Sequence, residues 1–159
     1  MTLASQVFEK LSVHGLKLAT AESCTGGMVA ASITDIAGSS TIFDRGFVTY
    51  SNAAKAEMLS VPADLIDEFG AVSEEVARAM AEGALKHSLA DISIAITGVA
   101  GPGGGTAEKP VGLVHFAVAT HNSTVAKVQR FGNLTRSEIR DRATHFGLEM
   151  VLAAEIKRL

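Results

Sequence analysis

The sequence is poor in cysteine, in aromatic side chains and in long apolar runs. Its 159 residues include one cysteine, one tyrosine and no tryptophan. A single cysteine excludes an intramolecular disulfide framework and favours a reducing compartment, so we expect a cytoplasmic protein. No run of about 18 apolar residues occurs, so we expect no membrane-spanning helix and no membrane partner. The formal net charge of −3 excludes strong non-specific binding to nucleic acid as the main design, and we expect no nucleic-acid partner.

The composition is that of a folded globular chain. Hydrophobic residues make up 47% of the sequence and charged residues 19%, and no repeat or low-complexity tract interrupts it. A chain of 159 residues is the size of one ordinary domain, so we expect a single domain over residues 1–159. The mean hydropathy of +0.27, and apolar helices that need cover on both faces of a sheet, favour a homodimer or a larger homo-oligomer.

Hydrophobic periodicity predicts alternating helical and extended segments. We expect helices at residues 3–13, 26–36, 52–59, 62–69, 73–89 and 135–158, and strands at 16–21, within 41–50, and at 91–97, 111–119 and 124–131. The segment at 91–97 carries isoleucines on one face and small residues on the other, which lets a helix pack closely. The last two strands are joined by the turn THNS, which predicts a hairpin and hence a mixed sheet. Together these segments indicate one α/β domain with about five strands and with helices on both faces of the sheet.

The segment AESCTGG, residues 21–27, lies between the end of a strand and the start of a helix. At this junction the free N–H groups of the helix start can hold an anion or an oxyanion. Two candidate nucleophiles, Ser23 and Cys24, stand side by side there. The segment also allows a structural interpretation, in which Ser23 or Thr25 caps the helix and the glycines permit close packing.

The segment GFVTYSNAAK, residues 46–55, places a lysine where a helix disfavours it. Ser51 or Asn52 can cap the following helix, so Lys55 falls in the first turn, near the positive end of the helix dipole. A positive field lowers the pKa of an amine, and a general-base lysine needs a lowered pKa. Tyr50 is the only tyrosine, and its hydroxyl could orient such a site. The alternative is a solvated lysine and a tyrosine that only packs.

Two further segments could bind an anion. The stretch GVAGPGGG at residues 98–105 fits neither a Walker A loop nor a dinucleotide-binding GxGxxG motif, which argues against an ATPase or a Rossmann site. Its backbone N–H groups could still approach a phosphate or a carbonyl. Arg136 and Arg140 lie one turn apart on the last helix, where they could reach a phosphate or a carboxylate. Glycines that only form turns, and arginines that are only solvated, are the alternative interpretations.

The histidines give no indication of a metal site. The sequence has five of them, and they show none of the spacings with each other or with the cysteine that are typical of metal ligands. His115 alternates within the expected strand at 111–119 and is most simply a buried histidine. We therefore expect no metal and no other cofactor.

Taken in order, several segments resemble the CinA C-terminal domain family. They are TAESCTGG at 20–27, ITDIAGSS at 33–40, RGFVTYSNAAK at 45–55, GAVSEEV at 70–76, ITGVAGPGGG at 96–105, EKPVGLV at 108–114 and RSEIR at 136–140. The resemblance implies a three-layer α/β/α sandwich with a mixed, mostly parallel sheet. Stand-alone members of the family include nicotinamide mononucleotide deamidases of the PncC type. It therefore also implies an amidase that converts nicotinamide mononucleotide to nicotinate mononucleotide and ammonia, in pyridine nucleotide salvage.

Carried over motif by motif, the resemblance implies three catalytic residues. Ser23 is the nucleophile, Lys55 is its base, and Tyr50 relays the proton or orients the pair. The oxyanion is expected at N–H groups near Thr25 and Gly26. The implied substrate-binding residues are Thr25, Gly26, Gly27, Thr97, Gly98, Gly101, Gly103, Gly104, Arg136 and Arg140. The expected partner is a small nucleotide substrate.

Two other interpretations stay open on the sequence. Full-length CinA proteins are associated with competence and damage responses, and a member without turnover would bind nucleotides or protein partners. A cysteine hydrolase that uses Cys24 is chemically plausible, but the sequence offers no evident histidine partner. The nucleotide pyrophosphatase domain found in longer relatives does not occur in these residues, so we do not expect that activity.

Overall fold

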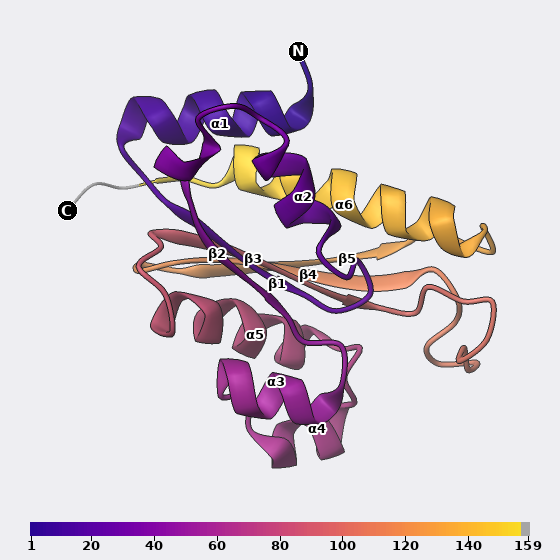
Figure 1. Cartoon of the computed structure of the whole chain (residues 1–159). Helices are drawn as coiled ribbons and strands as arrows, with labels where there is room; N and C mark the ends of the chain where they lie inside the picture. Colours follow the sequence, from indigo (N-terminus) through magenta and orange to yellow (C-terminus); the bar gives the residue numbers. More distant parts are fainter. Residues whose placement is uncertain (157–159) are drawn as a thin grey trace.

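A five-stranded mixed sheet forms the middle layer of the fold (Figure 1). In the computed structural model, which describes residues 1–156, its strands are β1 (Leu18–Glu22), β2 (Phe43–Val48), β3 (Ile92–Gly98), β4 (Leu113–Thr120) and β5 (Thr124–Arg130). Their order is β2-β1-β3-β4-β5. β1 pairs in parallel with β2 and β3, whereas the β3–β4 and β4–β5 pairs are antiparallel, so four of the five strands run in one direction. The prediction of a mixed sheet is confirmed.

Helices cover both faces of this sheet, which confirms the three-layer α/β/α arrangement (Figure 1). One layer contains α1 (Leu3–His14), α2 (Met28–Thr34) and α6 (Arg136–Ala153). The other contains α3 (Asn52–Leu59), α4 (Ala63–Phe69) and α5 (Glu74–Lys86), and a short 3-10 helix, η1 (Ser39–Thr41), precedes β2. α5 lies on the sheet, and α3 and α4 pack against α5. None of the described helices is long and apolar enough to cross a membrane.

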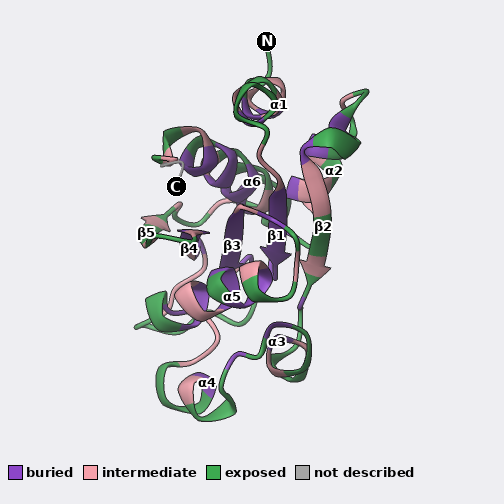
Figure 2. Cartoon of the chain, turned by 90° about the vertical axis from the view of Figure 1, so that its left-hand side faces the viewer, coloured by how far each residue is buried: buried purple, intermediate pink, exposed green. Residues whose placement is uncertain are grey.

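The central strands are buried from both sides (Figure 2). On β3, Ile92, Ile94 and Ile96 pack into the cluster beneath α1, α2 and α6, whereas Ala95 belongs to the cluster beneath α5. Ser93, on the same face as Ala95, donates its hydroxyl hydrogen to a carbonyl of α5 at 2.6 Å. The predicted division of β3 into a bulky face and a small-residue face is therefore confirmed.

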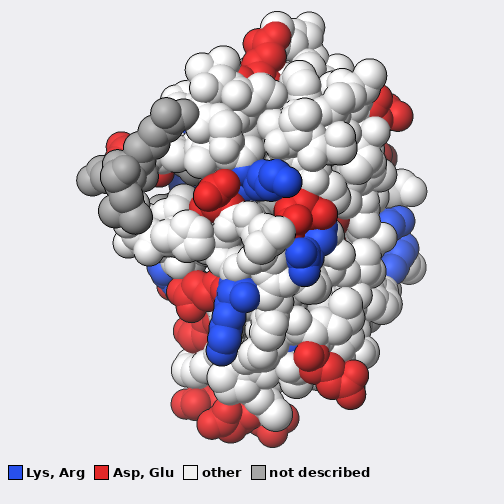
Figure 3. All heavy atoms as spheres, turned by 60° about the vertical axis from the view of Figure 1, so that its left-hand side comes forward, with Lys and Arg blue, Asp and Glu red and all other residues white. Residues whose placement is uncertain are grey.

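On the side of the molecular surface that Figure 3 shows, acidic and basic side chains are interspersed.

Several element boundaries differ from those predicted. α2 begins at Met28 instead of residue 26, because Gly26 and Gly27 have positive φ angles of 59° and 108°. α5 ends at Lys86 instead of 89, and the last helix ends at Ala153. Residues 154–156 are not helical, and the rest of the segment predicted to 158 lies outside the described residues. The Lys10 ammonium donates to the carbonyls of Leu152, in the last turn of α6, and of Ala154, its C-cap residue, both at 2.6 Å.

The helix that carries Lys55 docks closely on α5. Gly83 in α5 faces the end of α3, and a Cβ added to Gly83 would overlap the carbonyl group of Leu59. Only a glycine permits this approach, because the obstacle is backbone and cannot rotate away. The position of α3, and with it the position of Lys55, therefore depends on the missing side chain at Gly83.

We predict that Gly83→Ala destabilises the protein by about 1–3 kcal/mol, because the added methyl group overpacks the α3–α5 contact. Helix propensity alone would act in the opposite direction by about 0.5–1 kcal/mol. Gly103→Ala is the matched control, since nothing lies within 4 Å of its added Cβ, and it should change stability by less than about 0.5 kcal/mol. Urea unfolding of both variants checks this, and a Gly83→Ala variant as stable as the parent would contradict the docking argument.

Candidate active site

Ser23 and Lys55 are in hydrogen-bond contact although they are 32 residues apart in the sequence, with Nζ 3.1 Å from Oγ. Ser23 directly follows β1, and its N–H donates to the carbonyl of Ile96 in β3 at 2.9 Å. Lys55 lies near the start of α3, which Ser51 caps by accepting a hydrogen bond from the Ala54 N–H at 3.0 Å. The helix cap and the strand end thus bring the two functional groups together.

The Lys55 side chain is buried among neutral groups. It is 1% exposed, and its Nζ also contacts the carbonyl oxygens of Thr49 at 2.9 Å and Tyr50 at 3.3 Å. No carboxylate makes an ion pair with it among the described residues. Burial lowers the pKa of Lys55 from its ordinary value of 10.5. The sequence predicted a lowered pKa for Lys55 on the basis of the helix dipole, whereas the principal cause in the structure is the exclusion of water from the amine.

The three acceptors suit both protonation states of the amine. A protonated lysine has three N–H donors, and here each has one acceptor. A neutral amine has two N–H groups and one lone pair. When the carbonyls of Thr49 and Tyr50 accept the two N–H groups, the lone pair is directed at the Ser23 hydroxyl. This arrangement allows Lys55 to take the proton of Ser23 without moving.

Cys24, the neighbouring candidate nucleophile, is a poorer choice. Its side chain is buried, and burial raises the pKa of the thiol to about 11. A thiol with this pKa is protonated at neutral pH, and the protonated form is a weak nucleophile. No histidine lines the cavity beside it.

The side chain of Glu22, the last residue of β1, lies at the N-terminal end of α2, a position that the sequence did not indicate. Its buried carboxylate accepts hydrogen bonds from the Thr25 hydroxyl at 2.7 Å and from the N–H groups of Val29 at 2.9 Å and Ala30 at 3.1 Å. The cap residue itself, Gly27, has no side chain to do so. The interpretation of Ser23 or Thr25 as the helix cap is therefore wrong. Because a glycine at the N-cap cannot accept a hydrogen bond from the helix N–H groups, Gly27 was the sequence feature that could have indicated an acceptor elsewhere, here Glu22.

One of the N–H groups expected to receive an oxyanion, that of Gly26, already has a partner within the chain. The Gly26 N–H donates to the Ser23 carbonyl at 3.1 Å, which closes a turn around the serine. Arg140 lies against this turn and donates from Nε to the Cys24 carbonyl at 3.0 Å and from Nη2 to the Thr25 carbonyl at 3.3 Å. The N–H groups of Gly26, Val29 and Ala30 thus bond to the protein's own groups.

A cavity of about 180 Å³ opens in front of the serine–lysine pair. Six of the predicted residues line it, namely Ser23, Tyr50, Lys55, Thr97, Gly98 and Arg136. Seven others do not, namely Thr25, Gly26, Gly27, Gly101, Gly103, Gly104 and Arg140. The wall also contains Asn52, Ala71, Val72 and Ala100, which the sequence did not identify as site residues. Ala71 and Val72 carry no polar group that could have marked them, and tertiary packing alone brings them here.

Arg136 and Tyr50 meet at this cavity. Arg136 donates from Nη1 to the Gly101 carbonyl at 2.8 Å and from Nη2 to the Tyr50 hydroxyl at 2.9 Å. Tyr50 is 62% exposed, and its hydroxyl is bonded to Arg136 instead of Ser23 or Lys55. The geometry therefore favours an orienting role for Tyr50 over a proton relay. Arg136 has no acidic partner among the described residues, so its charge can meet an anion.

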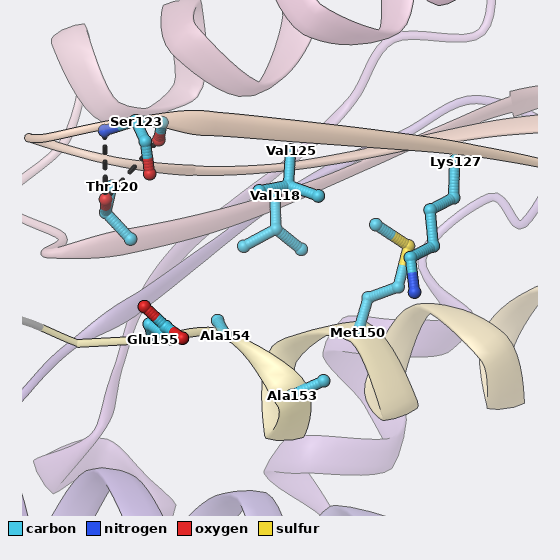
Figure 4. A pocket seen from close by; sticks show the side chains of 9 residues that line it. All are labelled: Val118, Thr120, Ser123, Val125, Lys127, Met150, Ala153, Ala154 and Glu155. Carbon is cyan, nitrogen blue, oxygen red and sulfur yellow. Dashed lines mark hydrogen bonds between the residues drawn. The ribbon is translucent and has the colours of Figure 1, made fainter.

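A second cavity of about 270 Å³ lies between β4, β5 and the end of α6 (Figure 4). Val118, Val125 and Met150 make much of its wall apolar. Of its polar residues, Thr120 and Ser123 bond to each other at 3.3–3.4 Å, and Lys127 and Glu155 also line it. With no nucleophile–base pair, this cavity is not the candidate active site.

Comparison with known proteins shows extensive similarity. The CinA C-terminal domain matches residues 1–154. The nicotinamide-nucleotide amidohydrolase PncC of Escherichia coli strain K12 is 50% identical over 149 residues, which cover 94% of this chain and 90% of that protein. Among solved structures, competence/damage inducible protein CihA from Agrobacterium tumefaciens has a TM-score of 0.93 and 49% identity, covering 95% of this chain and 92% of that one.

Other relatives are much longer than this chain. A CinA-like protein of Colwellia psychrerythraea is 56% identical over 116 residues, which are 73% of this chain but 27% of that protein. Across three such relatives the matched part spans between 27% and 36% of their length. The similarity to them concerns one part of a larger protein.

The buried amine predicts a pH-dependent effect of Lys55→Met on stability. Because the pKa of Lys55 is lowered in the folded state, burying the charged form costs free energy below that pKa. The cost disappears as pH rises towards the unfolded value of 10.5. The parent should therefore gain stability relative to Lys55→Met between about pH 7 and about pH 10, as measured by urea unfolding.

Lys86→Met, at an exposed lysine of α5, is the matched control and should show no such trend. A stability difference between the parent and Lys55→Met that stays constant over this pH range would contradict the lowered pKa.

Proposed function

This chain belongs to the CinA C-terminal domain family, and from this membership together with its buried serine–lysine pair we propose that it is a nicotinamide-nucleotide amidohydrolase. The reaction converts nicotinamide mononucleotide and water to nicotinate mononucleotide and ammonia. The observation that carries the catalytic assignment is the contact of 3.1 Å between Lys55 Nζ and Ser23 Oγ, with two backbone carbonyls holding the same amine.

The first half of the reaction forms an acyl-enzyme. Neutral Lys55 takes the hydroxyl proton of Ser23 while Oγ bonds to the carboxamide carbon, and the carbonyl oxygen becomes an oxyanion. The C–N bond then breaks, and ammonia leaves with the proton that Lys55 returns. In the second half, Lys55 takes a proton from water, hydroxide attacks the ester, and Ser23 recovers its proton as nicotinate mononucleotide departs. Lys55 thus acts as base and acid in turn, which suits an amine of lowered pKa.

The oxyanion needs a donor that is not already bonded within the protein. The Gly26 N–H is taken by the Ser23 carbonyl, and the N–H groups of Val29 and Ala30 are taken by Glu22. We assign the role to the N–H of Cys24, which follows the nucleophile directly and belongs to a residue of the cavity wall. An amide directly after the nucleophile is a recurrent oxyanion donor in serine hydrolases.

Arg136 is the residue that we assign to the substrate's phosphate. It lines the cavity, has no acidic partner within residues 1–156, and binds two neutral acceptors that a phosphate could replace. The Tyr50 hydroxyl fixes the guanidinium beside the cavity before substrate arrives. Arg140 takes no part in this contact, because its donors are directed at the turn behind Ser23.

We predict that Ser23→Ala and Lys55→Met each lower kcat by about three orders of magnitude or more, because each removes one half of the pair. Cys24→Ser should retain most of the activity, since its thiol is protonated at neutral pH. Ammonia release from nicotinamide mononucleotide measures all three, with circular dichroism to confirm folding. Loss of activity in Cys24→Ser but not in Ser23→Ala would show that Ser23 is not the nucleophile. If the parent releases no ammonia, a binding protein without turnover is favoured.

We further predict that Arg136→Ala raises KM for nicotinamide mononucleotide about ten- to a hundred-fold, the loss expected for one charge-assisted contact of about 1.5–3 kcal/mol. Nicotinamide riboside, which lacks the phosphate, should be a poor substrate for the parent and should respond little to this variant. Steady-state kinetics with both substrates measure the difference. Equal kcat/KM for the two substrates in the parent would contradict the proposed contact between Arg136 and the phosphate and would indicate a general amidase.

A further inference from the structure

We infer that Arg140 is a positioning residue, which holds the turn that carries Ser23 in its reactive conformation and does not bind substrate. This inference rests on the serine mechanism of the proposed function, although not on the identity of the substrate. It gives the two arginines of the RSEIR segment different tasks.

The turn has one bond of its own. The Gly26 N–H donates to the Ser23 carbonyl at 3.1 Å, so the peptide group between Cys24 and Thr25 lies at the centre of the turn. Rotation of this central peptide would change the turn type and would move Thr25 towards a positive φ, which it does not have here. Such a rotation would change the direction of the neighbouring side chains and N–H groups.

Arg140 fixes this central peptide from outside. Its Nε donates to the Cys24 carbonyl at 3.0 Å, and its Nη2 donates to the next carbonyl, that of Thr25, at 3.3 Å. Since the peptide is trans, the Thr25 N–H points away from Arg140 as long as the first of these bonds holds. Two adjacent carbonyls bound by one rigid fork leave the peptide one orientation.

The local sequence leaves space for this guanidinium. Gly26 has a φ of 59°, and a Cβ built on it would lie 3.3 Å from Arg140 Nη2. On the opposite side, the Glu22 carboxylate holds the Thr25 hydroxyl at 2.7 Å. The turn is thus held by a carboxylate at its base and by a guanidinium at its carbonyls. Arg140 does not line the cavity, so its effect on the reaction must pass through the turn.

This arrangement predicts a kinetic signature. Displacement of a nucleophile by about 1 Å lowers the rate of the chemical step about a hundred-fold, while contacts that bind the substrate elsewhere persist. We expect Arg140→Ala to lower kcat about a hundred-fold and to change KM for nicotinamide mononucleotide less than threefold. Arg140→Lys keeps the charge but cannot bind both carbonyls, and it should recover only part of the loss. Guanidinium ion added to Arg140→Ala should restore part of kcat.

A second readout does not depend on the substrate. A fluorophosphonate reacts with an activated serine by forming an Oγ–P bond and breaking the P–F bond, so that fluoride leaves and Lys55 takes the serine proton. We expect the parent to be labelled at Ser23, and Arg140→Ala to be labelled at least about ten-fold more slowly, as followed by intact mass. Arg142→Ala, at an exposed arginine of the same helix, is the matched control and should react like the parent. Thermal unfolding of each variant confirms that it is folded.

The outcomes separate the two proposals. Slow labelling of Arg140→Ala supports the positioning role even if nicotinamide mononucleotide proves not to be the substrate. Labelling of Arg140→Ala at the parent rate, or a raised KM with unchanged kcat, overturns it while leaving the proposed function intact. A parent chain that is not labelled at Ser23 overturns both the positioning role and the serine mechanism.

Discussion

The burial of the Lys55 amine among neutral acceptors is the constraint on which the site depends. An isolated ammonium is costly to bury, and a carboxylate partner would offset that cost by holding the amine charged. Here the partners are two backbone carbonyls and the Ser23 hydroxyl, which stabilise the amine without fixing its charge. The same three contacts that make the burial tolerable therefore leave an amine directed at the Ser23 hydroxyl.

The order of the strands explains why these groups meet. β1 lies between β2 and β3, and all three run in parallel, so their carboxyl ends share one edge of the sheet. Ser23 follows β1, Tyr50 follows β2 and Thr97 lies near the end of β3. The antiparallel hairpin of β4 and β5 widens the sheet on the other side of β3, and β5, which runs in the same direction as β3, returns the chain to this edge before α6. The docking of α3 on α5 at Gly83 then brings Lys55 over the same edge.

Charged side chains around the site divide into those that hold the backbone and those that face the cavity. Glu22 and Arg140 bond to the turn around Ser23 and to the start of α2, and neither lines the cavity. Arg136, one helical turn before Arg140, faces the cavity instead. Internal bonds thus hold the turn that carries Ser23, and the Arg136 guanidinium remains directed at the cavity.

Local sequence patterns predicted the helices and strands and the residue types of the site. Hydrophobic periodicity predicted the helices and strands to within a few residues, apart from the short 3-10 helix at residues 39–41, and the ordered motifs predicted that Ser23 and Lys55 belong to one site. Local patterns carry this information because they reflect burial of one face of each element and the caps at its ends. The boundary of α2 was less predictable, because its capping group, Glu22, lies in the preceding strand.

Which of the candidate groups face the cavity depends on tertiary packing. Arg136 and Arg140 look alike in the sequence, and the direction in which each points depends on how α6 packs across β3 and the Ser23 turn. The lowered pKa of Lys55 is likewise a property of the assembled fold, since its main cause is exclusion of water and no local pattern encodes that exclusion. Sequence thus specified the chemistry available, and packing specified which atoms are placed to use it.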